Sequence, residues 1–376
     1  MQAPEEEVLP VRSDKARRRI SCLVLGLTGV ALLALCGLML SCVFFGYGAT
    51  GFVLLPFGRN NIHLTRPTSP DTLSIYQGTA TVDAVAWSPD GQRVASAQED
   101  GQVQSWNAAH ASIVMNYAGN GSAVLTLAWS PDGQWLAAGE SDGIVRIWNA
   151  SNGQQVYAYQ GHASSITRVA WSPDSQRIAA LLQQANGNTT VTIWDATTGV
   201  HAISVSGETA LAWSPNGQQI ATYDGEHTVM VWNSSTGQRI TSYTLHNTSG
   251  LGVDALSWTP DGQLVLASTY ANYVQFWKVN TGQMHLSAQS HKEPIEALAW
   301  SPNLRYVASA SQDETVDVWD ASSGALLYTY PCYIGIVTSV AWSPHGKRIV
   351  SGSGSELPTL GNVKDDTVQV WRVPLP

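Results

Sequence analysis

The feature that most constrains this chain is a tryptophan repeat that runs through most of its length. The string Trp-Ser-Pro, once Trp-Thr-Pro, starts at Trp87, Trp129, Trp171, Trp213, Trp258, Trp300 and Trp342, at intervals of 42, 42, 42, 45, 42 and 42 residues. A second series, usually followed by Asp or Asn, falls between them at Trp106, Trp148, Trp194, Trp232, Trp277, Trp319 and Trp371. The fifteenth tryptophan, Trp135, belongs to neither series. A fixed period of this length indicates one supersecondary unit repeated seven times.

Each copy carries the signals of short strands separated by turns. In the sixth copy, residues 295–300 alternate apolar and small side chains before a Ser-Pro-Asn turn. Residues 306–311 predict a second strand, residues 315–319 a third with an apolar period of two, and residues 326–330 a fourth. Four strands joined by turns match the length of a propeller blade, so we predict an all-β, seven-bladed β-propeller.

These residues closely resemble the Trp-Asp (WD) repeat family over about residues 72 to 374. In that family a buried tetrad of His, Ser or Thr, Asp and Trp ties each blade together. The resemblance implies that the sixth copy keeps the whole tetrad, as His291, Ser309, Asp313 and Trp319. The first copy keeps Ser96, Asp100 and Trp106 without the His, and the third keeps His162 and Trp194 but has Ala180 at the hydroxyl position. A buried hydrogen bond contributes about 0.5–1.5 kcal/mol net, so we expect softer blades rather than a lost fold.

The two ends of the repeat region predict how the ring closes. After Trp371 only five residues remain, which is too few for the outer strand of the seventh copy. Residues 72–77 read like the outer strands of other copies, and pairing them with the last copy removes two unsatisfied sheet edges. We therefore assign residues 72–376 to the propeller, and we expect Leu73 and Ile75 to lie beside Val368 and Val370.

A long uncharged segment near the amino terminus predicts a membrane anchor. No charged side chain occurs from residue 20 to residue 58, and residues 20–47 are long and apolar enough for one helix to cross about 30 Å of hydrocarbon. Five Lys and Arg residues precede the segment, whereas only Arg59 and Arg66 follow it before the propeller. The positive-inside bias then predicts a cytoplasmic basic tail over 1–19, a single-pass transmembrane helix over 20–47, a linker over 48–71 and an exocytoplasmic propeller.

Other interpretations of this segment are weaker or leave its topology open. A cleaved signal peptide has a shorter apolar core, and the lipoprotein-like string that ends at Cys42 is followed by apolar residues. A helical hairpin across residues 20–57 would return the propeller to the cytoplasm. Residues 46–51 match the spacing of a dinucleotide fingerprint, with Asp71 downstream, but no βαβ unit surrounds them.

Charge and composition exclude several classes of function. Residues 67–376 carry 12 Lys and Arg against 24 Asp and Glu, so this acidic body disfavours nucleic acid as a partner. Cys332 is the only cysteine outside the apolar segment, which rules out a disulfide framework in the propeller. No zinc-protease spacing, nucleophile elbow or Walker loop occurs, and the Asp residues after Trp-Ser-Pro have the chemistry of turns. We predict that the protein is not an enzyme and needs no cofactor or metal.

Length variation among the copies points to one face of the ring. Insertions at 183–190 and 351–366 separate second and third strands, and another at 243–254 joins an outer strand to the next inner one. In this connectivity all three project from one face, near Tyr223, Tyr270, Tyr273 and Tyr333.

The interpretation that follows is a membrane-anchored, monomeric interaction scaffold for a protein or peptide partner. The style of the Ser-Pro-Asp-Gly-Gln turns looks bacterial. One alternative is an exported ligand-sensing or transport-accessory propeller that binds a ligand in its channel. The other is a propeller enzyme, for which the inner strands offer only Asp83 and Asp254.

Overall fold

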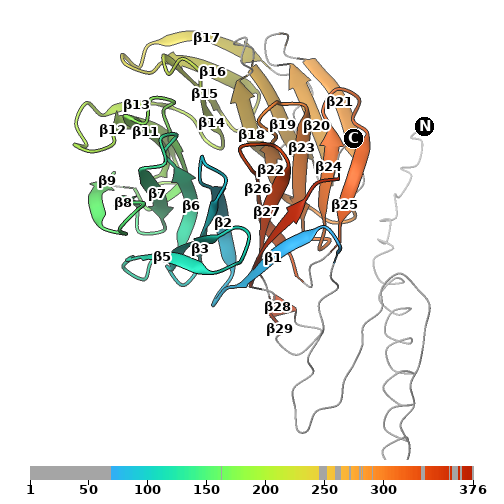
Figure 1. The fold of residues 1–376 in the computed structure, drawn as a ribbon. Coiled ribbons are helices and arrows are strands. Elements are labelled where there is room, and N and C mark those ends of the chain that lie inside the picture. Colours follow the sequence, from blue (N-terminus) through green and yellow to red (C-terminus); the bar gives the residue numbers. More distant parts are fainter. Residues whose placement is uncertain are drawn as a thin grey trace, which may run out of the picture. The chain divides into compact units, whose positions relative to one another are not determined.

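The computed structural model describes residues 69–374, with gaps at 162, 245–251, 259–263, 271, 279–280, 282, 290, 332–334, 355, 358–362 and 365 (Figure 1). The predicted basic tail and transmembrane helix, and the linker up to residue 68, lie outside the described residues. Among the residues described, no helix is long and apolar enough to cross a bilayer.

The described strands form seven four-stranded antiparallel sheets and one short hairpin, and we number the sheets in chain order. Sheets one to three comprise β2 (Val82–Trp87), β3 (Arg93–Gln98), β4 (Val103–Asn107) and β5 (Ile113–Tyr117); β6 (Val124–Trp129), β7 (Trp135–Glu140), β8 (Ile144–Asn149) and β9 (Gln155–Gln160); and β10 (Ser165–Trp171), β11 (Arg177–Gln183), β12 (Thr189–Asp195) and β13 (Ile203–Ser206).

Sheets four to six repeat the same order of strands. They comprise β14 (Leu211–Trp213), β15 (Gln219–Tyr223), β16 (Thr228–Asn233) and β17 (Arg239–Thr244); β18 (Gly252–Trp258), β19 (Leu264–Tyr270), β20 (Tyr273–Lys278) and β21 (Gln283–Gln289); and β22 (Ile295–Trp300), β23 (Tyr306–Ser311), β24 (Val316–Asp320) and β25 (Leu326–Tyr330).

Sheet seven joins the two ends of the repeat region. It comprises β26 (Val337–Trp342), β27 (Arg348–Ser353), β30 (Thr367–Arg372) and β1 (Thr72–Gln77), while β28 (Glu356–Leu357) and β29 (Val363–Lys364) form the hairpin. β1 pairs with β30 as predicted, but Ser74 lies opposite Val370 and Tyr76 opposite Val368, so the residues facing these valines are not the expected Leu73 and Ile75. The inner strands β2, β6, β10, β14, β18, β22 and β26 contact one another in a closed cycle (Figure 1). The predicted all-β propeller is therefore confirmed.

The turn after each inner strand explains the recurring Ser-Pro-Asp-Gly string. In sheet two, the Ser130 hydroxyl donates to Asp132 Oδ1 at 2.5 Å and accepts the Trp135 amide at 2.9 Å. Asp132 Oδ1 also accepts the Gln134 amide at 3.0 Å, and Gly133 supplies the φ of +72° that the turn requires. The prediction that these Asp residues serve turns is confirmed here, and Asp90 and Asp174 make the same amide contacts.

Tryptophans of the first series connect sheets one, three, four, five and seven to the sheet before each of them. The indole nitrogens of Trp129 and Trp300 have no hydrogen-bond partner among the described residues. The indole N–H of Trp171 donates to Ala128 O at 3.0 Å, and that of Trp342 donates to Ala299 O at 3.1 Å. Trp87 closes the cycle by donating to Ala341 O in sheet seven at 3.2 Å. Each such bond gives a buried indole N–H a partner on the neighbouring backbone.

In sheets one, three and seven an arginine six positions after this tryptophan covers the indole of the next sheet. The guanidinium carbon of Arg93 lies 4.7 Å from the ring centroid of Trp129, and that of Arg177 lies 4.9 Å from Trp213. Arg348 reaches Trp87 in the same way at 5.0 Å. Distances below about 6 Å over an indole face are those of cation–π contacts.

Trp135 occupies this covering position in sheet two. It is partly buried and packs on a cluster that includes Trp171 and Trp194 of sheet three. The tryptophan outside both series therefore takes the place that arginine holds in sheets one, three and seven.

Candidate functional site

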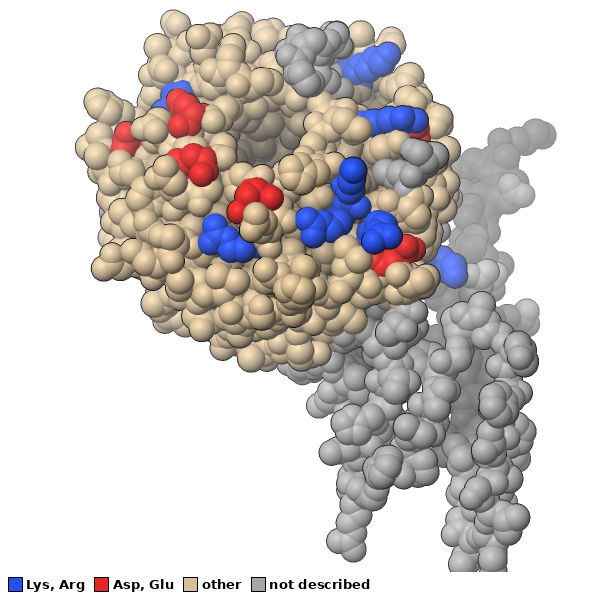
Figure 2. All heavy atoms as spheres, viewed as in Figure 1, with Lys and Arg blue, Asp and Glu red and all other residues tan. Residues whose placement is uncertain are grey.

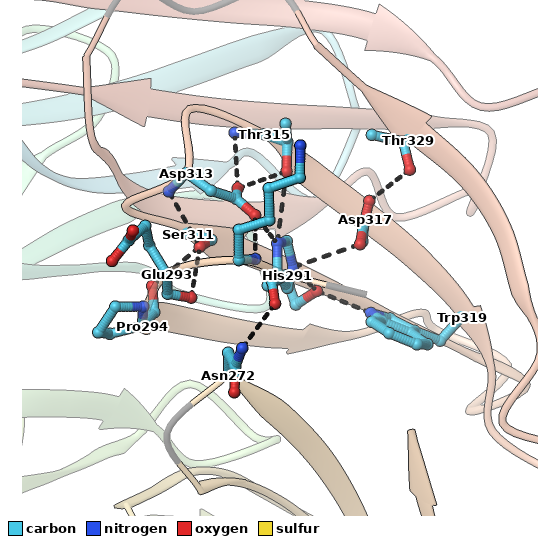
Figure 3. A network of polar contacts seen from close by, with 12 residues as sticks. Asn272, His291, Glu293, Pro294, Ser311, Asp313, Thr315, Asp317, Trp319 and Thr329 are labelled. Carbon is cyan, nitrogen blue, oxygen red and sulfur yellow. Dashed lines mark hydrogen bonds and ion pairs between the residues drawn. The ribbon is translucent and has the colours of Figure 1, made fainter. Parts of the chain in front are cut away.

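The four residues of the implied tetrad meet in sheet six, and Figure 3 labels His291, Asp313 and Trp319 of this network. His291 precedes β22, Ser309 lies on β23, Asp313 lies in the turn after β23, and Trp319 lies on β24. His291 Nδ1 lies 3.0 Å from Asp313 Oδ2, and His291 Nε2 lies 2.7 Å from Ser309 Oγ. The Trp319 indole donates to the same hydroxyl at 2.7 Å. One chain of hydrogen bonds thus joins the loop before β22, the strands β23 and β24, and the turn between those two strands.

Two carboxylates flank the imidazole ring of His291. Burial alone would raise the pKa of Asp313, but hydrogen bonds from His291, Thr315 and the Lys292 amide hold it well below its usual range. Asp317 lies 3.6 Å from His291 Nε2, and its own burial raises its pKa. The hydrogen bonds therefore favour the charged form of Asp313, whereas burial disfavours the charged form of Asp317.

Asp313, His291 and Ser309 are hydrogen-bonded in the same order as the residues of a hydrolase triad. Whether a substrate can reach the Ser309 hydroxyl decides whether they could act as one. The Ser309 side chain is fully buried and His291 is 2% exposed. Because Ser309 Oγ also accepts the Trp319 indole N–H, the hydroxyl faces the core rather than a cleft. The geometry therefore stabilises the sheet and offers no route to acyl transfer.

Other sheets keep only parts of this arrangement. An indole donates to a hydroxyl from Trp371 to Ser351 at 3.0 Å and from Trp232 to Thr222 at 2.9 Å. In sheet one, however, neither Ser96 Oγ nor Trp106 Nε1 has a hydrogen-bond partner in the described part of the chain. His162, the implied member in the third copy, lies outside the described residues.

Sheet two holds a buried ion cluster that sequence reasoning missed. Arg146 on β8 pairs with Glu140 at the end of β7, and its Nη2 lies 3.1 Å from Asp142 Oδ2. Asn120 donates to that carboxylate oxygen at 2.8 Å. The available signal was the presence of Glu140 and Arg146 in strands that are otherwise apolar.

The four tyrosines assigned to a partner-binding face have different surroundings. Tyr223 is fully buried between sheets four and five, and its hydroxyl donates to Glu226 O at 2.6 Å. Its side chain is therefore not on an exposed face, which corrects that assignment. Tyr273 is 36% exposed and pairs with Tyr270 at the turn between β19 and β20. Tyr333 lies outside the described residues.

Asp83 is the carboxylate of the inner strand β2. Its burial, together with the charge of Glu99, raises its pKa to about 6. Among the described residues, no group of three or more His, Cys, Asp and Glu side chains could hold a metal ion. Asp83 is therefore an acid whose neutral form is favoured by burial and by the charge of Glu99.

Three protein-family models match parts of this ring. The family described as WD domain, G-beta repeat matches residues 71–107, 283–320 and 324–372. The WD40 domain of anaphase-promoting complex subunit 4 matches residues 114–174. These matches support a WD-repeat propeller. A model of eukaryotic translation initiation factor eIF2A also matches residues 162–288 of the propeller, and no curated protein matches the chain.

We predict that the tetrad of the WD-repeat propeller contributes measurable stability only where it is complete. Ser309→Ala leaves two buried partners, His291 and Trp319, without their shared hydroxyl, and each such loss costs about 1–3 kcal/mol. Ser96→Ala is the matched control, because that hydroxyl is equally buried but has no partner in the described residues. Urea denaturation of both variants measures the difference, and equal losses would contradict the prediction.

Asp83 gives the WD-repeat propeller a pH dependence of known sign. A carboxyl whose pKa rises from 3.8 unfolded to about 6 folded weakens the folded state once pH climbs through that window. Asp83→Asn should therefore gain stability over the parent protein at pH 7.5, and this gain should vanish near pH 4. Thermal melts at both pH values measure it, with Glu99→Gln expected to give a smaller gain of the same sign. A gain that is equal at both pH values would refute the assignment.

Proposed function

We propose that the protein is a non-enzymatic interaction scaffold built on a seven-bladed WD-repeat propeller. The observation that carries the proposal is the closed cycle of inner strands, in which indoles connect successive sheets. Such a ring holds its turns rigidly while their sequences vary, which is the usual setting for binding residues. WD-repeat propellers typically serve as protein-interaction scaffolds, and the buried tetrad argues against hydrolysis.

The proposed binding face lies at the turns that join second and third strands. It includes the turn between β19 and β20 with Tyr270 and Tyr273, the turn at residues 184–188, and the β28–β29 hairpin. Antiparallel strands that run in the same order around a ring place these turns at one end. An exposed tyrosine there offers apolar area and a polar tip, which suits a protein or peptide partner.

We also propose that a single transmembrane helix over residues 20–47 tethers the propeller. The uncharged segment and the cationic residues before it support this anchor, and they support an exocytoplasmic propeller. The linker over 48–71 then leads into β1. The bacterial origin suggested by the Ser-Pro-Asp-Gly-Gln turns stays a prediction.

The proposed face is tested by photo-crosslinking in cells that express the full chain. A photoreactive phenylalanine in place of Tyr273 should give discrete protein adducts, because this side chain lies at the proposed face. The same group in place of Ile113, which is 49% exposed on the outer strand β5, is the control. We expect at least about fivefold higher adduct yield at the first position, and it should fall in a Tyr270→Ala background. Equal yields and the same adducts at both positions would refute this face.

The anchor and its direction are tested by extraction and proteolysis of the full chain. We expect the protein to remain with membranes in alkaline carbonate, and we expect deletion of residues 20–47 to release it. Protease added to intact cells, after removal of any outer barrier, should digest the propeller. Digestion only after lysis would overturn the exocytoplasmic assignment and favour the hairpin.

A further inference from the structure

A basic pocket lies at the end of the ring opposite the proposed partner face. Its volume is about 680 Å³. The turns after β22 and β26 contribute Arg305, His345 and Lys347, and the first residue of β27 contributes Arg348. Arg372 at the end of β30 adds a fourth full positive charge. Figure 2 shows Lys and Arg side chains gathered on one sector of the visible face. A pocket of roughly 300–1,000 Å³ is the size that small-molecule ligands occupy.

The charge of this pocket departs from that of the propeller. Residues 67–376 carry 24 acidic against 12 basic side chains, yet four of those 12 line this pocket and no carboxylate does. Arg305 approaches an acidic partner, with its Nε 3.7 Å from Asp320 Oδ2. Grouped like charges repel one another, so an anion in the pocket would relieve an unfavourable field.

The basic side chains of the pocket differ in the contacts that they already make within the fold. Arg348 is engaged in the fold, because its Nη2 donates to Gly91 O at 2.8 Å and its guanidinium covers Trp87. Within the described residues, the side chains of Lys347 and Arg372 make no hydrogen bond or ion pair, and both are exposed. Their donors are therefore available to a ligand, while Arg348 fixes the pocket wall.

We propose that this pocket binds a phosphate ester, with Lys347 and Arg372 as its main ligands and Arg305 beside them. A phosphate monoester carries nearly two negative charges and three acceptor oxygens, which suit several cations better than a single carboxylate does. Guanidinium groups match its oxygens in paired hydrogen bonds, and the ammonium group adds a mobile point charge. Leu73, which is 38% exposed, and Val373 form an apolar wall for the organic part of the ester.

The ester could be a free metabolite or the headgroup of a phospholipid, because both present the same chemistry. Leu73 belongs to β1, the first strand after the proposed linker, so this wall of the pocket is close in sequence to the proposed membrane anchor. The site itself does not depend on the scaffold function or on that anchor. Its test uses soluble probes that separate the two sources.

Isothermal titration calorimetry on the full chain in nonionic detergent tests the site. The probes are glycerol 3-phosphate, dihexanoyl phosphatidic acid, neutral dihexanoyl phosphatidylcholine and the dicarboxylate succinate. We expect at least one phosphate monoester to bind more tightly than succinate and phosphatidylcholine, with an affinity that falls as salt rises. Binding of glycerol 3-phosphate identifies a free ester as sufficient, whereas binding of phosphatidic acid alone identifies a lipid headgroup.

Paired charge variants show whether the pocket is responsible. Lys347→Gln with Arg372→Gln should weaken phosphate binding at least about tenfold, and Arg305→Gln should weaken it less. Arg239→Gln with Lys292→Gln removes the same charge at exposed positions outside the pocket and should change the affinity less than about twofold. Thermal melts check that each variant is folded. No binding by either phosphate, equal loss in the two double variants, or succinate binding as tightly would overturn the proposal.

Discussion

The contact on which this ring depends is the one between an indole and the neighbouring sheet. Each Trp-Ser-Pro tryptophan for which the bond is present donates its N–H to the backbone of the preceding sheet, as Trp171 does to Ala128. An arginine of the preceding sheet also covers the ring in two of these cases, as Arg177 covers Trp213 and Arg348 covers Trp87. A sheet removed from this cycle would leave apolar faces exposed on both neighbours, so the sheets stabilise one another rather than folding as independent units.

The repeat predicted the architecture because the two tryptophans of each copy are visible in the sequence and also make the packing contacts that hold the ring together. The all-β propeller follows from the period, and the strand that the two chain ends share lies where the unsatisfied edges require it. Side-chain surroundings were harder to predict. Tyr223 was assigned to the binding face because it lies near the loops there, but its side chain is buried between sheets four and five. Nothing in the local pattern shows which neighbour will cover such a residue.

Charge shows the same limit of sequence reasoning in another form. A net acidic composition argues against a surface that attracts nucleic acid over its whole area. It does not show how the acidic and basic side chains are distributed among the faces. Lys347 and Arg372 are 25 residues apart in the sequence, and only the pairing of β27 with β30 brings their turn and strand end together. The buried Glu140–Arg146 pair likewise joins adjacent strands, and burial alone raises the pKa of Glu140 while Arg146 opposes the rise. Removing one partner of such a buried pair destabilises the fold, because the other charge is left buried without a partner.

Sheet seven has a consequence for how the protein is made. Thr72 pairs with Trp371, so the outermost strand is synthesised first and receives its partner last. During translation β1 has an open hydrogen-bonding edge until β30 leaves the ribosome, and closing so long a loop slows the final step of folding. A nascent chain that stalls late would expose two sheet edges at once, which makes incomplete products targets for chaperones and proteases.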